Sequence, residues 1–64
     1  MNNKIAYFRG IDEISQRELA RRVGISNAEL SRIENGKRRP NVDIAIKLAE
    51  ELNTTVEILF KNDN

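Results

Sequence analysis

The chain has 64 residues, of which 39% are hydrophobic and 33% are charged, and this length allows one domain with one small core. The absence of cysteine and histidine excludes a disulfide framework, a thiolate nucleophile and a zinc cluster. The net charge of +1 is unevenly distributed, because residues 16–39 carry seven basic and three acidic side chains whereas residues 40–64 carry two and five. A basic middle segment indicates a polyanionic partner.

Neither a signal peptide nor a membrane-spanning segment is expected from the sequence. Its first ten residues, MNNKIAYFRG, lack an apolar stretch of signal-peptide length, and no apolar run approaches the roughly 20 residues that cross a bilayer. We therefore expect a soluble, cytoplasmic protein that forms a single domain over residues 1–64.

The first predicted helix is short. Ile5 and Phe8 form an apolar pair at i, i+3 spacing, and the helix is expected to end near Gly10. The stretch GIDEI then reads as a loop before the next helix.

The next two helices begin with one repeated pattern, ISxxEL, which occurs at residues 14–19 and again at residues 25–30. The serine is suited to N-cap a helix, and the glutamate three residues later is expected to complete a capping box. The isoleucine and leucine have the spacing of a hydrophobic staple. Each pattern therefore predicts a helix start, with Ser15 and Ser26 as the caps and Glu18 and Glu29 as their partners.

The connection between these two helices is very short. The first is predicted over about 16–23, because Gly24 suits the left-handed position after a helix. The second follows the Ser26 cap directly and runs to about Asn35. Two helices joined so tightly cross at a large angle, which is typical of a helix-turn-helix, and the small Ala20 permits close approach.

Two more helices are predicted after the turn NGKRRPN. Asn41 is suited to cap a fourth helix, in which apolar residues recur every four positions from Ile44 to Leu52. Asn53 suits the left-handed position after that helix, and Thr55 is suited to cap a short fifth helix. No segment predicts a strand, so the fold class is all-α with five short helices.

The segment SQRELARRVGISNAELSRIENGKRRP resembles the helix-turn-helix domains of the phage lambda and 434 repressor and Cro family. The shared features are ordered and specific: Gln after the first cap, Glu-Leu-Ala, Val-Gly, then Ile-Glu-Asn-Gly-Lys and a proline. The resemblance covers nearly the whole chain and implies a five-helix DNA-binding domain, with the second helix across the backbone and the third in the major groove. The sequence departs from the family pattern at Glu13, where family members often have glycine.

The third helix carries the candidate base-reading residues. Leu30 and Ile33 are predicted to face the core, which leaves a polar face on the opposite side. The resemblance assigns base reading to Asn27, Ala28, Ser31 and Arg32. Asn can bond adenine, Arg can bond guanine, and Ala can pack on a thymine methyl group. The alternative is that these residues only fill an exposed helical face.

Phosphate contacts are expected at the start of the second helix and in the loop after the third. Free N–H groups at a helix N-terminus favour an anion, and a glutamine side chain adds a neutral donor. The candidates are Ser15, Gln16, Arg17, Asn35, Lys37, Arg38 and Arg39. The alternative for the charged loop residues is ordinary solvation.

Glu34 is an acid in a segment that should approach DNA. It lies one turn after Leu30, on the side that faces the protein. In the family the matching acid pairs with an arginine of the first helix, and Arg9 occupies that position here. The resemblance therefore predicts a structural Arg9–Glu34 ion pair.

The predicted function is sequence-specific binding of double-stranded operator DNA by a transcriptional regulator, of repressor type. An enzyme is not expected, because the sequence has no phosphate loop, metal-ligand cluster or nucleophile–base pair, and no cofactor or small-molecule ligand is indicated. The alternative is a helix-turn-helix adaptor or antitoxin-like module that binds protein. Family members bind as two-fold dimers, so a homodimer on DNA is expected, with Val56, Ile58 and Phe60 as the candidate contact.

Overall fold

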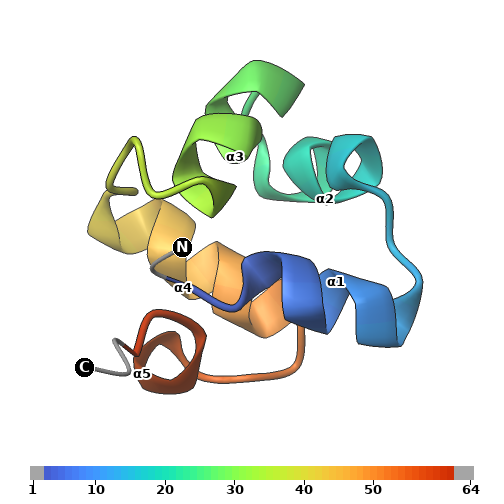
Figure 1. Cartoon of the computed structure of the whole chain (residues 1–64), viewed down its shortest axis with the longest axis vertical. Helices are drawn as coiled ribbons and strands as arrows, with labels where there is room; N and C mark the ends of the chain where they lie inside the picture. The colour runs from blue at the N-terminus through green and yellow to red at the C-terminus, as the bar shows by residue number, and fades with distance from the viewer. Residues whose placement is uncertain (1–2, 62–64) are drawn as a thin grey trace.

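Five helices make up the part of the chain that the computed structural model describes, residues 3–61 (Figure 1). They are α1 (Ile5–Asp12), α2 (Gln16–Val23), α3 (Asn27–Glu34), α4 (Val42–Glu51) and α5 (Val56–Leu59). Over residues 3–61 there is no strand, and no helix is long and apolar enough to cross a membrane. The predicted all-α architecture is confirmed.

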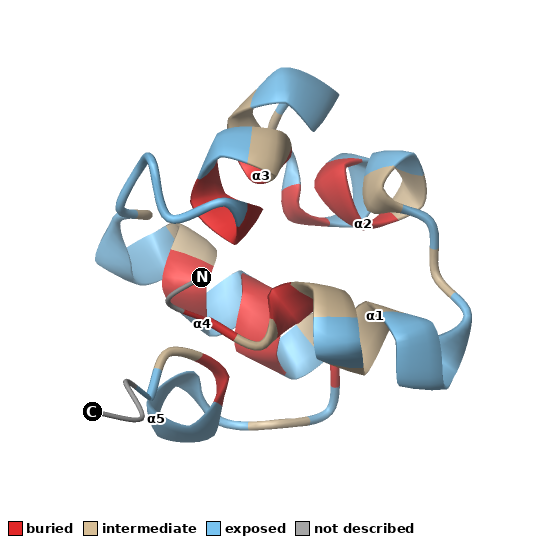
Figure 2. Cartoon of the chain, in the orientation of Figure 1, coloured by how far each residue is buried: buried red, intermediate tan, exposed pale blue. Residues whose placement is uncertain are grey.

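The core forms where the apolar sides of all five helices meet. Helix α4 packs against α2 and α5, α2 also packs against α1 and α3, and the buried surfaces face inward on every helix (Figure 2). Burial of these side chains is the main favourable term in folding. The buried cluster consists of Ile5, Leu19, Ala20, Val23, Leu30, Ile33, Leu48, Ala49, Leu52 and Leu59.

Both copies of ISxxEL start a helix, as predicted. Ser15 Oγ accepts a hydrogen bond from the Glu18 backbone N–H at 3.0 Å, and Ser26 Oγ accepts one from the Glu29 N–H at 3.0 Å. The expectation of complete capping boxes is wrong: the Glu18 carboxylate accepts hydrogen bonds from Arg21 and Arg22, and the Glu29 carboxylate forms an ion pair with Arg38, instead of returning to the caps. A guanidinium is a charged donor, and it competes successfully with a neutral backbone N–H for the carboxylate.

The turn between α2 and α3 closes as the sequence predicts. Gly24 adopts a left-handed conformation with φ of 80°. Its N–H and the N–H of Ile25 both donate to the carbonyl oxygen of Ala20, at 2.9 and 3.0 Å. Ala20 is almost fully buried where the two helices approach each other.

The caps of the last two helices are also confirmed. Asn41 Oδ1 accepts from the Ile44 N–H at 2.8 Å, and Thr55 Oγ1 accepts from the Ile58 N–H at 3.1 Å. Asn53 takes the left-handed position with φ of 56°.

The predicted end of the first helix is wrong. Helix α1 continues through Gly10 to Asp12, and Glu13 takes the left-handed conformation with φ of 55°. The N–H groups of Glu13 and Ile14 donate to the carbonyl oxygens of Gly10 and Arg9, respectively. Glycine inside a helix costs only about 1 kcal/mol, so these hydrogen bonds and the packing of α1 outweigh the local preference of Gly10.

Asn3 joins the start of the chain to the end of α3, which sequence reasoning missed. Its Nδ2 donates to the Ile33 carbonyl oxygen at 2.8 Å, and its Oδ1 accepts from the Ile5 N–H at 3.2 Å. The neighbouring Lys4 N–H donates to the Leu59 carbonyl oxygen at 2.8 Å. The segment before α1 therefore holds α3 and α5 together.

Gly10 and Gly24 make a matched pair for testing these two helix ends, because at neither position does an atom from elsewhere in the chain lie within 4 Å of the place that an alanine methyl group would take. Gly10→Ala should raise the free energy of unfolding by about 0.5 to 1 kcal/mol, since alanine loses less chain entropy in a helix. Gly24→Ala should lower it by about 1 kcal/mol, since alanine is strained at positive φ. Urea unfolding of both variants measures the two effects, and equal signs would contradict the assigned helix end.

Candidate nucleic-acid interface

Helix α3 has one buried side and one exposed side. Leu30 and Ile33 are buried in the core, while Asn27, Ala28 and Arg32 are exposed. The Arg32 side chain retains 57% of its accessible surface. Asn35 is exposed at the C-terminal end of the same side, and the remaining candidate on α3, Ser31, is partly buried. Three of the four predicted base-reading residues are therefore exposed on this side of α3, and the fourth, Ser31, is partly covered.

At the start of α2, Gln16 is more constrained than its sequence position suggests. It is partly buried, and its Nε2 donates to Glu34 Oε1 at 3.2 Å. The amide has one further N–H to offer a ligand. Its neighbour Arg17 is exposed, and the Ser15 hydroxyl oxygen is already engaged as the α2 cap.

The expected ion pair between Arg9 and Glu34 is present and bidentate. Arg9 Nε donates to Glu34 Oε2 at 2.7 Å, and Arg9 Nη2 donates to Oε1 at 3.1 Å. Arg9 Nη1 also donates to the Ile14 carbonyl oxygen at 3.0 Å. The Glu34 side chain is only 7% exposed, so its charge depends on these donors and on Gln16.

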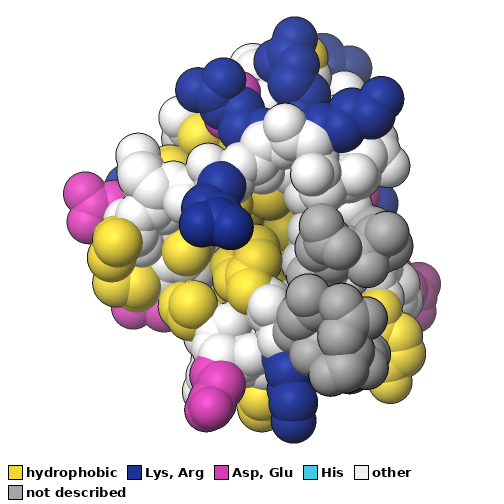
Figure 3. All heavy atoms as spheres, turned by 60° about the vertical axis from the view of Figure 1, so that its left-hand side comes forward, with side chains coloured by type: hydrophobic (Ala, Val, Ile, Leu, Met, Phe, Trp, Pro, Cys, Tyr) yellow, Lys and Arg dark blue, Asp and Glu magenta, His cyan; other side chains and the backbone are white. Residues whose placement is uncertain are grey.

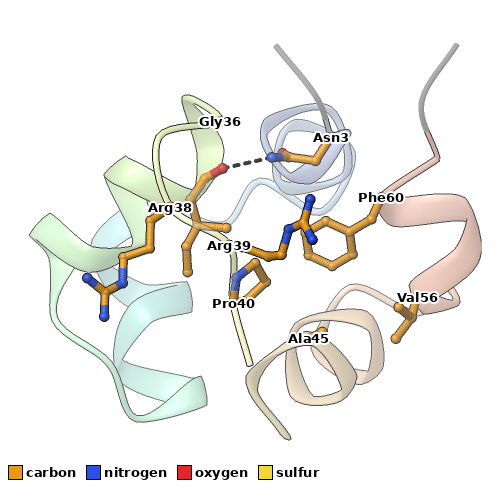
Figure 4. Close-up of a pocket in the computed structure, with 9 residues that line it drawn as sticks. Asn3, Gly36, Arg38, Arg39, Pro40, Ala45, Val56 and Phe60 are labelled. Atoms are coloured by element: carbon orange, nitrogen blue, oxygen red, sulfur yellow. Dashed lines mark hydrogen bonds between the residues drawn. The ribbon is translucent and has the colours of Figure 1, made fainter. Parts of the chain in front are cut away.

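The three basic residues after α3 do not form one cluster. Lys37 is exposed, and Arg38 Nε lies 2.6 Å from Glu29 Oε2, which draws the side chain back along α3. Arg39 extends in the other direction, beside Phe60 in a groove between the loop, α4 and α5 (Figure 4). This groove has a volume of about 460 Å³, and Pro40 and the Asn3 amide also line it.

Basic side chains gather at the end of the molecule where α3 lies (Figure 3).

On α2, Glu18 accepts hydrogen bonds from Arg21 Nη2 at 2.6 Å and from Arg22 Nε at 2.9 Å. The hydrogen bond from Arg21 has the larger effect and that from Arg22 the next, and together they lower the pKa of the Glu18 carboxyl from 4.5 to about 2. The same contact raises the pKa of the Arg21 guanidinium. Arg21 and Arg22 thus pair with an acid on their own helix.

Glu29 is the interface residue whose contacts sequence reasoning missed. The capping-box pattern predicts that it serves the α3 cap, yet its carboxylate contacts Arg38 and lies 3.7 Å from Arg32 Nη1. The i, i+3 spacing to Arg32 was a visible signal for the second contact. No local signal indicated Arg38, because that contact depends on how the loop folds back.

A helix-turn-helix family model matches residues 6–59. The chain belongs to this family, that of lambda repressor-like DNA-binding domains.

Relatives of this helix-turn-helix domain include an uncharacterized HTH-type transcriptional regulator of Methanocaldococcus jannaschii, 33% identical over 60 residues, which are 94% of this chain and 91% of the relative. The solved DNA-binding domain of the P22 c2 repressor is 30% identical with a TM-score of 0.83, over 94% of this chain and 79% of that one. The SinR protein in its complex with SinI protein is 27% identical with a TM-score of 0.84. That match covers 95% of this chain and 61% of the SinR chain.

These similarities make the chain the DNA-binding domain of an HTH-type transcriptional regulator, a family that is not enzymatic. In this helix-turn-helix domain the Arg9–Glu34 pair joins α1 to α3, and the tight turn at Gly24 joins α2 to α3.

Glu34→Gln should lower the free energy of unfolding by about 3 to 5 kcal/mol, because it leaves the Arg9 guanidinium largely buried without its counter-charge. That loss is comparable with the whole stability expected of a domain this small. Glu57→Gln on the exposed surface of α5 removes the same charge and should change the stability by less than about 0.5 kcal/mol. Circular dichroism during urea and thermal unfolding measures both, and equal midpoints would show that the ion pair contributes nothing.

Glu18 should make the stability of the helix-turn-helix domain pH-dependent. The pKa of Glu18 is lower in the folded state than in the unfolded state. Its contribution to the free energy of unfolding is therefore complete above about pH 4.5 and is lost as the pH falls toward 2. The stability difference between the wild type and Glu18→Gln should shrink over that range. NMR titration should place the Glu18 midpoint near 2, and Arg21→Gln should return it toward 4.5; an unchanged midpoint in that variant would refute the assigned cause.

Proposed function

We propose that this domain binds double-stranded operator DNA sequence-specifically, with α3 in the major groove, and acts as a repressor. The observation that carries the proposal is the exposed side of α3, where Asn27, Ala28 and Arg32 are exposed to solvent while the opposite side is buried in the core. Arginine can donate two hydrogen bonds to guanine O6 and N7, asparagine can donate to adenine N7 while accepting from its N6 amino group, and the alanine methyl group suits thymine. Ser31, partly buried on the same side, is a further candidate for a base contact.

Phosphate contacts would flank this base-reading surface on both sides. On one side lies the start of α2, with the Ser15 cap, the Gln16 amide and Arg17. On the other side lie Asn35 and the exposed Lys37 at the end of α3, followed by Arg38 and Arg39. Such contacts set the register of a protein on the duplex, whereas base contacts choose the sequence.

The repressor role is supported by the likeness to the P22 c2 repressor domain over 94% of this chain. A domain that occupies an operator can block transcription without a separate catalytic activity. One small module buries too little surface for tight specific binding, so the operator would hold two copies on half-sites about one helical turn apart. The exposed apolar side chains of Val56 and Ile58, together with the partly buried Phe60, are the surface we propose for the contact between copies.

Selection of bound duplexes from a random pool tests the proposal directly. The expected product is a two-fold symmetric sequence with half-sites about 10 base pairs apart. Sedimentation of the selected complex should give two protein chains per duplex. Failure to bind any duplex at low salt would refute the proposed function and favour a protein-binding adaptor, and one chain on one half-site would refute the dimer.

Arg32→Ala and Lys37→Ala separate base reading from phosphate binding. Arg32→Ala should reduce the preference at one base pair by about 1 to 3 kcal/mol, because its guanidinium no longer distinguishes the bases there. Lys37→Ala should weaken binding to all sequences alike and flatten the log–log salt dependence by about one. Fluorescence anisotropy with matched and single-mismatch duplexes measures both, and loss of sequence preference in Lys37→Ala would contradict the division of roles.

A further inference from the structure

One carboxylate on α3 lies between two candidate DNA-binding arginines. Glu29 Oε2 is 2.6 Å from Arg38 Nε, and Glu29 Oε1 is 3.7 Å from Arg32 Nη1. The Glu29 side chain is 25% exposed, whereas the side chains of Arg38 and Arg32 are 60% and 57% exposed. The carboxylate is therefore less exposed to solvent than either of the two guanidinium groups.

The equivalent glutamate in the other copy of ISxxEL behaves differently. Glu18 pairs with Arg21 and Arg22, which lie three and four residues later on its own helix. Four residues after Glu29 the chain has the core residue Ile33, so the second arginine comes from the loop after α3 instead. The carboxylate of Glu29 thus links the recognition helix to the loop that is proposed to contact phosphate.

This arrangement has a direct electrostatic consequence for DNA binding. An arginine that already neutralises a carboxylate releases fewer counterions when it meets a phosphate, because part of its charge is compensated. The carboxylate itself is repelled by phosphates nearby. Both effects oppose binding through the backbone, which is the part of the affinity that does not depend on sequence.

We propose that Glu29 is a specificity-determining residue, which pairs with Arg38 and Arg32 and so weakens phosphate-driven binding to duplexes of any sequence. Discrimination then rests on base contacts, for which Arg32 exchanges its loose contact with Glu29 for a bidentate contact with guanine. This inference rests on the proposed DNA-binding function.

The test compares Glu29→Gln with Glu18→Gln, a control that removes the same charge at the same position of the other repeat. Affinity is measured by anisotropy over a range of salt concentrations, on a selected operator and on a duplex of unrelated sequence. Glu29→Gln should bind the unrelated duplex about fivefold more tightly than the control does, with a log–log salt slope steeper by about 0.9. For Glu29→Gln, the ratio of the affinity for the operator to the affinity for the unrelated duplex should fall below that of the control.

A second pair of variants identifies the arginine whose charge is no longer compensated in Glu29→Gln. Arg38→Gln should cost less affinity for the unrelated duplex in the wild-type background than in the Glu29→Gln background, because Glu29 compensates part of the Arg38 charge in the wild type. The same substitution in the Glu29→Gln background should remove the gain. Arg38→Gln remains informative if Glu29→Gln does not fold, because the loss of affinity from Arg38→Gln alone should be smaller than that from Lys37→Gln. An equal or larger loss would overturn the proposal.

The outcomes also separate this inference from the proposed function. If the wild type binds its operator but Glu29→Gln matches Glu18→Gln on the unrelated duplex, or binds it more weakly, then Glu29 does not limit non-specific binding. If the wild type binds no duplex at all, the proposed function itself is wrong.

Discussion

The buried carboxylate of Glu34 is the constraint on which the arrangement of the first three helices depends. A charge that is only 7% exposed is stable there because three N–H groups satisfy it, two from Arg9 on α1 and one from Gln16 on α2. Glu34 lies at the end of α3, so one side chain connects all three helices. Removing it would leave a guanidinium without its partner in a domain with a small core.

This connection also bears on the interface. Gln16 stands at the start of α2, where a phosphate is proposed to bind, and its amide is held by the same carboxylate that anchors α3. Helices α2 and α3 are thus joined both by the Gln16–Glu34 hydrogen bond and by the tight turn at Gly24. Because Glu34 makes these contacts on the inner side, the exposed side of α3 is not needed to join α3 to α1 and α2. Its residues are therefore available for the DNA contacts that we propose.

The helix starts were predictable because their causes lie within four residues of each other. The Ser15, Ser26, Asn41 and Thr55 caps all form with the backbone N–H three residues later, as expected. The end of α1 was not predictable in this way. Gly10 is a local signal for a helix end, but hydrogen bonds to the Arg9 and Gly10 carbonyl oxygens extend the helix to Asp12.

The sequence by itself determined where four of the five helices begin, which sides are apolar, and which family the chain resembles, because capping and periodicity are local. Tertiary structure decided which side chains meet. Glu29 meets Arg38 across nine positions of sequence, and Asn3 meets Ile33 across 30, only because α3 and its loop fold back onto the rest of the chain. The physical reason is that a side chain's partner depends on the packing of whole helices, whereas a helix start depends on one turn of backbone.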